Sequence, residues 1–167
     1  MNYLWDNIFR RKPKDQDLHS VLKENILFRD LTDRELQFVE NIVHSRRYHA
    51  GESVFTQGEV GVGMYIIARG RVEIFVQDET ASQSDFKEIF ITQLLEGDFF
   101  GELSLVEDSG RRTASAIARE ESALIGFFKP DLMEILARSP STGVKIVFRL
   151  AEVLGRRLEE TTDKVSE

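Results

Sequence analysis

The segment from Gly97 to Leu105 places glycine, carboxylate and helix-forming residues together in a pattern that suits anion binding. Gly101 lets the backbone approach a phosphate closely, because no Cβ intervenes. The residues that follow it, 102–105, can form one helical turn whose free N–H groups point at the anion. Further along the chain, Arg112 can close on the same phosphate through a charge-assisted hydrogen bond. These residue types predict a site for a small anion.

The carboxylate of Glu102 needs a different partner, because it repels phosphate. In such a site it must face a hydrogen-bond donor, and a ribose hydroxyl is the natural one. We therefore infer that the ligand is a nucleotide, with one phosphate held beside its sugar.

The composition indicates one ordinary globular domain. The chain has 167 residues, of which 41% are hydrophobic and 31% charged, enough for a single core. The net charge of −7 argues against a nucleic-acid-binding surface. The absence of cysteine excludes disulfides, thiol nucleophiles and cysteine-bound metals. Because the sequence also lacks a membrane-spanning apolar run and a signal peptide, we expect a cytoplasmic protein.

Residues 1–16 form a separate N-terminal extension with amphipathic character. Its apolar residues are Tyr3, Leu4, Trp5, Ile8 and Phe9, and the basic run 10–14 follows them. Such a segment can lie on a membrane surface or dock on a partner. We favour a short helix that packs on its own domain, since small amphipathic helices usually cover core.

The spacing of apolar residues divides the rest of the chain into a helical part and a β part. Helical periodicity extends over residues 17–47, with a capping box at Thr32–Glu35. From Tyr48 to Phe128, short apolar runs alternate with glycine turns, which predicts a mainly β domain, an antiparallel barrel or jelly roll. We therefore predict a domain of flanking helices and β-roll over 17–140 and a C-terminal helix over 141–167.

This last helix has an apolar stripe with steps of three and four residues. The stripe consists of Val147, Leu150, Leu154, Leu158, Thr161 and Val165. Such a stripe suits a parallel contact between two helices, although it could instead pack on the chain's own barrel. We favour a homodimer, because a long helix rarely buries its whole stripe on one small domain.

Taken together, these features resemble the cyclic nucleotide-binding domain over residues 24–165. The resemblance rests on the Gly-Asp-Phe-Phe-Gly-Glu-Leu run from Gly97, on Arg-Thr-Ala from Arg112, and on glycines at 51, 58 and 70. It implies an eight-stranded antiparallel jelly-roll barrel (a double-stranded β-helix) with N-terminal helices and a long C-terminal helix.

The resemblance also assigns the phosphate contacts. Gly101 and the backbone of Leu103 and Thr113 would meet the phosphate, Arg112 would pair with a phosphate oxygen, and the Thr113 hydroxyl would assist. Arg111 stands where many relatives carry proline or a polar residue, so either arginine could be the phosphate ligand. Counting to Thr113 favours Arg112, and Arg111 would then face solvent.

For the sugar and base, the resemblance assigns Glu102 to the ribose 2′-hydroxyl, and Ile74 and Thr92 to the base pocket. The final helix resembles the dimer helix of the bacterial catabolite activator proteins, in which two adjacent hydroxyl residues, one from each subunit, reach the adenine amino group. Here these would be Thr161 and Thr162, unless they only form a fraying terminal turn. Hydroxyls can accept or donate, so cyclic GMP stays open beside the favoured cyclic AMP.

The resemblance implies a cyclic nucleotide sensor rather than an enzyme, with no cofactor or metal. The catabolite activators continue into a DNA-binding domain, whereas this sequence ends at Glu167. We therefore expect a stand-alone sensor that acts through movement of its C-terminal helix on an unidentified protein partner or on a segment beyond this chain, without direct nucleic-acid contact. One alternative is an interaction module that has lost its ligand. Another is a cupin-type metalloenzyme, which the absence of a His-x-His pair disfavours.

Overall fold

The computed structural model describes residues 17–78 and 87–165. The predicted amphipathic extension, 1–16, lies outside the described residues. None of the described helices is long and apolar enough to cross a membrane.

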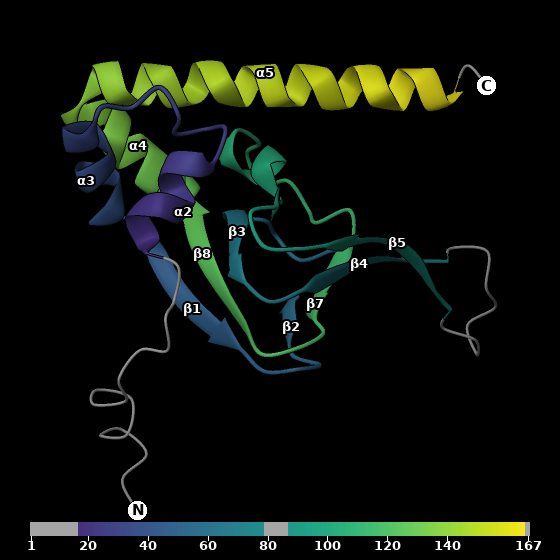
Figure 1. The fold of residues 1–167 in the computed structure, drawn as a ribbon. Coiled ribbons are helices and arrows are strands. Elements are labelled where there is room, and N and C mark those ends of the chain that lie inside the picture. The colour runs from purple at the N-terminus through teal and green to yellow at the C-terminus, as the bar shows by residue number, and fades with distance from the viewer. Residues whose placement is uncertain (1–16, 79–86, 166–167) are drawn as a thin grey trace, which may run out of the picture.

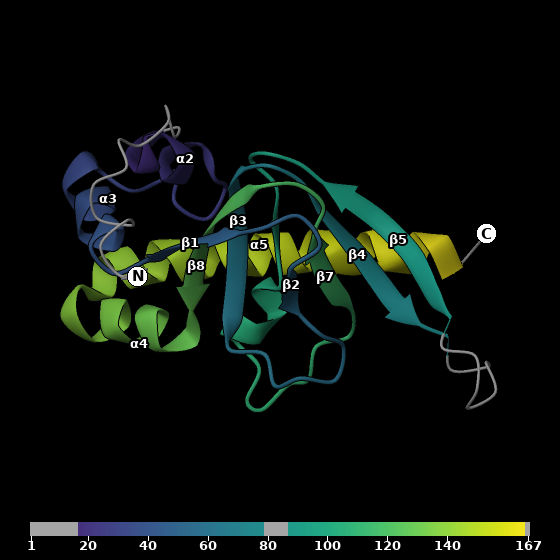
Figure 2. The ribbon, with the colours of Figure 1, turned by 90° about the horizontal axis from the view of Figure 1, so that it is seen from below.

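The described helices gather at one end of the β domain, and the last of them continues along its side (Figures 1 and 2). They are α2 (Leu18–Glu24), α3 (Asp33–Glu40), α4 (Lys129–Arg138) and α5 (Pro140–Val165). The predicted capping box is confirmed, because the Glu35 N–H donates to the Thr32 hydroxyl and the Thr32 N–H donates to the Glu35 carboxylate. Pro140 begins α5, where the missing N–H of proline costs no helical hydrogen bond.

Eight strands form two four-stranded antiparallel sheets. The strands are β1 (His44–Tyr48), β2 (Ser53–Phe55), β3 (Gly63–Arg69), β4 (Val72–Gln77), β5 (Glu88–Leu94), β6 (Phe99–Phe100), β7 (Ser115–Ala118) and β8 (Ser122–Phe128). Their orders are β1-β8-β3-β6 and β2-β7-β4-β5.

The eight antiparallel strands confirm the predicted mainly β fold, but their pairings divide into two separate sheets, so the predicted barrel is not confirmed. The chain changes sheet at short turns such as Gly70, whose φ of +96° glycine tolerates. The helical region also ends earlier than residue 47, because 44–48 pair with β8 as strand β1. This tertiary pairing overrides the weak helical periodicity there.

The two faces of the first sheet pack into different cores. Ile67 and Leu124 face the second sheet and pack with Tyr48. Their neighbours along the strands, Ile66 and Ile125, face the opposite way and pack against the helices. This alternation, with period two, fixes which side chains line the space between the sheets.

Polar contacts with the N-terminal helices hold the first half of α5. Lys145 Nζ lies 2.8 and 3.0 Å from the Glu35 carboxylate oxygens, and the Thr142 hydroxyl donates to Glu35 at 3.2 Å. Arg149 Nε donates to Asp30 at 2.6 Å. The second half of α5 continues past these contacts and runs above β4 and β5 in the view of Figure 1.

Only part of the predicted apolar stripe of α5 is exposed. Leu150 is buried in the chain's own core and Leu154 packs against it, whereas Val147 and Leu158 are exposed. An exposed stripe that shares Leu158 with the predicted one, again with steps of three and four, consists of Val144, Phe148, Ala151, Gly155, Leu158 and Thr162. The spacing of apolar residues did not distinguish the buried face of the helix from the exposed face, because both faces carry apolar residues.

Candidate functional site

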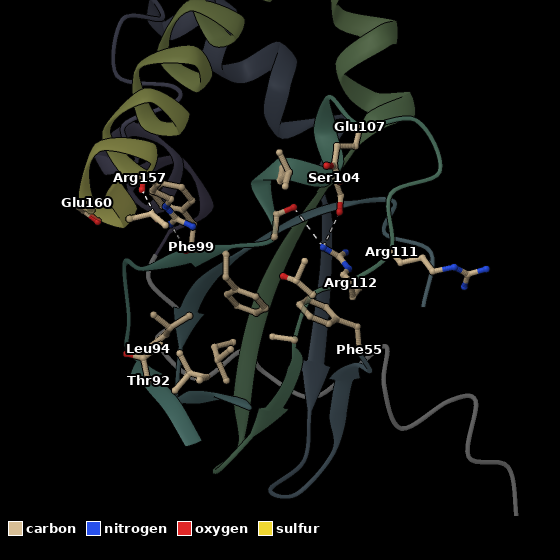
Figure 3. A pocket seen from close by; sticks show the side chains of 18 of the residues that line it. Phe55, Thr92, Leu94, Phe99, Ser104, Glu107, Arg111, Arg112, Arg157 and Glu160 are labelled. Carbon is tan, nitrogen blue, oxygen red and sulfur yellow. Dashed lines mark hydrogen bonds between the residues drawn. The ribbon is translucent and has the colours of Figure 1, made fainter. Parts of the chain in front are cut away.

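A cavity of about 630 Å³ lies between the second sheet, the turn after β6 and the second half of α5. Its size is typical of sites for small organic ligands. Figure 3 shows Thr92, Leu94 and Phe99 on one side of the cavity and Arg112 on the other, next to Phe55. The apolar lining comes from Phe55, Ile74, Ile91, Leu94, Phe99 and Phe100, and the polar lining includes Thr92, Arg112, Thr113 and Thr161.

Arg112 is a buried cation at this cavity, with only 7% of its surface exposed. Its guanidinium donates to the Gly63 carbonyl at 2.6 Å, to the Ser104 hydroxyl at 3.1 Å and to the Gly101 carbonyl at 3.4 Å. It also lies 4.0 Å from the centre of the Phe55 ring. All these partners are neutral, so among the described residues the buried charge has no counter-ion in contact.

Burial lowers the pKa of the Arg112 guanidinium, whereas Tyr65, Glu59 and Glu102 favour its charged form. An arginine side chain keeps its proton in proteins even so. A buried charge without an opposite charge is costly. The cavity is therefore a site that an anion would stabilise.

Gly101 begins the helical turn that the sequence predicts, observed as a 3₁₀ turn over Glu102–Leu105. Its φ of +80° is strained for other residues, and an added Cβ would lie 2.5 Å from Arg112 Nη1. The position therefore requires glycine for two reasons, its backbone conformation and the closeness of the guanidinium.

Glu102 is buried at the start of this turn, with 4% of its surface exposed. One carboxylate oxygen, Oε1, lies 2.5 Å from Nη1 of Arg157 on α5. The other, Oε2, is buried and has no hydrogen-bond partner among the described residues. A buried acceptor without a donor is unfavourable. A hydroxyl or N–H group of a ligand that donated to this oxygen would remove that cost.

The structure brings most of the predicted site residues together. Those that line the cavity are Ile74, Thr92, Gly101, Leu103, Arg112, Thr113 and Thr161. Glu102 lies beside it, at the contact with Arg157. Thr162 does not line the cavity, and its hydroxyl donates to the Leu158 carbonyl at 2.9 Å. Arg111 is exposed and donates to the Gly58 carbonyl at 2.7 Å, so only one of the two adjacent arginines is buried.

Sequence reasoning missed several residues of the site. Arg157 lies one turn before Thr161, hence on the same helix face, and this spacing could have identified it. Phe55 and Ser104 contact Arg112, but they come from separate elements and gave no local signal. The chain's three histidines were considered as metal ligands, and none of them lines the cavity. In the described part of the chain, no three His, Cys, Asp or Glu residues are grouped to hold a metal ion.

Comparison with known proteins agrees with this geometry. Residues 45–139 match the family model described as "Cyclic nucleotide-binding domain". The chain is 32% identical over 139 residues to the cyclic AMP receptor protein of Thermus thermophilus, covering 83% of this chain and 60% of the relative. It is 28% identical over 140 residues to the cAMP-activated global transcriptional regulator CRP of Salmonella typhimurium, covering 84% and 62%. The chain therefore spans about three fifths of the length of these relatives.

Solved structures show the same fold. The Thermus thermophilus catabolite activator protein superposes with a TM-score of 0.73 at 31% identity, covering 85% of this chain and 62% of that one. A cyclic nucleotide-binding domain from Methylobacillus flagellatus superposes with a TM-score of 0.75 at 21% identity, covering 88% and 82%. The sequence match, the fold and the cavity agree, and the chain belongs to the cyclic nucleotide-binding domain family.

Proposed function

We propose that this chain is a regulatory receptor for a cyclic nucleotide, with cyclic AMP favoured over cyclic GMP. One observation carries the proposal: at the cavity or beside it, a buried cation has no counter-ion in contact and a buried carboxylate oxygen has no hydrogen-bond donor. The Arg112 guanidinium contacts no counter-ion, and Glu102 Oε2 contacts no donor among the described residues. A cyclic nucleotide supplies both, because its ring phosphodiester is an anion and its 2′-hydroxyl is a donor.

The proposed phosphate contacts come from two segments. Arg112 would pair with a phosphate oxygen while the backbone of Gly101 and Leu103 donates to the anion. Thr113, the next residue along the chain, would add its N–H and hydroxyl. Charge-assisted hydrogen bonds of this kind are about twice as strong as neutral ones, so the phosphate would supply most of the affinity.

The proposed base contacts lie farther along the cavity. Ile74 and Thr92, Cα partners on β4 and β5, would cover one side of the base. Thr161 on α5 would reach its polar edge. A threonine hydroxyl can accept from the adenine amine or donate to the guanine carbonyl. The names of the similar receptors, "Cyclic AMP receptor protein" and "cAMP-activated global transcriptional regulator CRP", favour adenine.

The proposed output is a movement of α5. Lys145 and Arg149 anchor the first half of this helix to α3 and to the turn before it, and Arg157 connects its second half to Glu102. A nucleotide that binds Glu102 Oε2 would therefore act on the residue that also holds α5. Such a shift requires the ligand to bind one helix position more tightly than the other.

The exposed stripe of α5 supports a homodimer in the proposed receptor. Phe148 and Leu158 are each 69% exposed and Val144 is 61% exposed, which is unusual for large apolar side chains on one helix face. Pairing with the same helix of a second copy would bury them. In that arrangement Thr162 of the second copy would be the additional base contact. The proposal also includes a protein partner on which the receptor acts and which is not identified by the sequence.

Isothermal titration calorimetry with cyclic AMP and cyclic GMP tests the proposed function. Arg112→Gln removes the buried cation, and we expect at least about a 100-fold loss of affinity, since a buried charged hydrogen bond is lost. Arg34→Gln, at an exposed position outside the cavity lining, is the control and should bind within about threefold of the unaltered chain, because exposed charges contribute little. An unaltered chain that binds neither nucleotide would contradict the proposal and favour the interaction module.

A further inference from the structure

The cavity of the proposed receptor contains a carboxylate that the proposed contacts leave unused. Glu107 lines the cavity together with Ser104 and Arg112. Figure 3 shows these three side chains on the same side of the cavity, opposite Phe99 and Arg157. A carboxylate near an anion-binding group lowers the affinity for any anion. Glu107 therefore does not serve affinity, and specificity is the alternative.

Gly110 leaves the space that the Glu107 side chain fills. A Cβ added to Gly110 would overlap Glu107 Oε2 and would lie 3.0 Å from Glu107 Cβ. The φ of Gly110 is not positive, so space rather than backbone conformation requires glycine here. Gly110 directly precedes the two adjacent arginines. The Glu107 carboxylate therefore lies against the segment that carries Arg112.

The Glu107 carboxylate makes no ion pair with any described residue. The nearby cation Lys129 pairs with Asp108 and contacts Glu107 at its main-chain carbonyl, 3.2 Å away. The guanidinium of Arg111 donates to the Gly58 carbonyl. Because no contacting cation neutralises it, the charge of Glu107 acts on a ligand at the phosphate end of the cavity.

The charged side chains around the cavity nearly cancel. The cations in its lining are Arg111, Arg112, Arg157 and Lys164, and the carboxylates are Glu107 and Glu160 in the lining and Glu102 beside it. These four cations and three carboxylates leave one net positive charge. A cyclic phosphodiester carries one negative charge, whereas the phosphate of linear 5′-AMP carries about two at neutral pH. The balance of charges therefore fits the cyclic nucleotide better than the linear one.

Linear nucleotides have the same base and ribose as the cyclic nucleotide, so contacts with those parts distinguish them little. Rejection of a competitor of this kind needs a group that acts against it, such as an unpaired like charge. We propose that Glu107 restricts the receptor to singly charged cyclic phosphodiesters, because it repels the second charge of a linear 5′-phosphate. This inference rests on the proposed function, since it concerns the specificity of the same site.

Calorimetry of the full chain with three ligands tests this inference. The ligands are cyclic AMP, 5′-AMP and the methyl ester of 5′-AMP, which is linear but carries one charge. In Glu107→Gln we expect the affinity for 5′-AMP to rise at least about fivefold and that for the two singly charged ligands at most about threefold, because repulsion grows with the product of the charges. Asp108→Asn is the matched control, since this neighbouring carboxylate is exposed and does not line the cavity. It should leave the ratio of the 5′-AMP and cyclic AMP affinities unchanged.

Three outcomes would overturn the role of Glu107. An equal gain for all three ligands in Glu107→Gln would show that its charge does not discriminate between them. An unchanged 5′-AMP affinity would assign the rejection of linear nucleotides to the shape of the cavity, and an equal change of the ratio in Asp108→Asn would assign it to the general charge of the loop. Each of these leaves the proposed function intact if the unaltered chain binds cyclic AMP, whereas a chain that does not bind it would contradict both proposals.

Discussion

Arg157 Nη1 on α5 lies 2.5 Å from Glu102 Oε1, and this ion pair connects the end of the long helix to the turn that faces the proposed phosphate position. Arg157 is 47% exposed in its side chain and Glu102 only 5%, so the carboxylate depends on the arginine for its neutralisation. The pair uses one oxygen and leaves the other, Oε2, for a ligand.

Replacing Arg157 should weaken nucleotide binding through Glu102. In Arg157→Met we expect about a tenfold loss of cyclic AMP affinity, the effect of one charge-assisted hydrogen bond, because the carboxylate is no longer held toward the ribose. Calorimetry with cyclic AMP and its 2′-deoxy analogue measures this. Arg156→Met is the neighbouring control. Equal losses for both nucleotides would show that Arg157 does not act through the 2′-hydroxyl.

Glu102→Gln should remove the preference for a ribose. The amide keeps the size of the side chain but lacks its charge, so we expect about a tenfold loss for cyclic AMP and almost none for 2′-deoxy cyclic AMP. The two titrations in the unaltered chain and the variant make a double-mutant cycle. A coupling energy of zero would place the 2′-hydroxyl elsewhere.

Gly101→Ala should disturb the phosphate site directly. The new Cβ would lie 2.5 Å from Arg112 Nη1 at a φ of +80°, so the guanidinium must shift and the backbone is strained by about 1–2 kcal/mol. Gly97→Ala is a matched control, since its φ is +88° but no atom lies within 4 Å of an added Cβ. Both variants should melt at lower temperature, whereas only Gly101→Ala should lose nucleotide affinity. Similar affinities in the two variants would contradict this.

The Glu35–Lys145 contact should make stability depend on pH. Burial opposes ionisation of Glu35, but hydrogen bonds from Lys145 and Thr32 lower its pKa from 4.5 to about 2. A carboxyl with a lowered folded-state pKa stabilises the fold above its unfolded pKa and loses this contribution as pH falls toward the folded value. The difference in melting temperature between the unaltered chain and Glu35→Gln should therefore shrink from pH 5 to pH 2. Glu159→Gln, at an exposed position, is the control, and a constant difference would disprove the role of Glu35.

The exposed stripe of α5 should decide the oligomeric state. Phe148→Glu places a charge at a position that is 69% exposed in the single chain, so it should not disturb the fold but should prevent burial between two helices. We expect a dimer for the unaltered chain and a monomer for the variant, measured by size-exclusion chromatography with light scattering. Val62→Glu, at an exposed position in the loop before β3, should stay dimeric. A monomeric unaltered chain would contradict the homodimer.

The sequence determined the features that depend on neighbouring residues. The capping box at Thr32 and the helical turn after Gly101 follow from local sterics and hydrogen bonding, and the structure has both. Several short strands with glycine turns were likewise predicted, because strand alternation and turn chemistry are local properties, whereas the number of eight strands came from the resemblance.

Only the tertiary structure decided the relationships between distant segments. Whether α5 presents Leu150 or Phe148 to solvent depends on where the N-terminal helices hold it, and both stripes have the same periodicity in the sequence. The pairing of Arg157 with Glu102, the stacking of Phe55 on Arg112 and the division into two sheets also depend on packing between elements. Packing selects one arrangement among several that local patterns permit equally, because burial and charge pairing are summed over the whole domain.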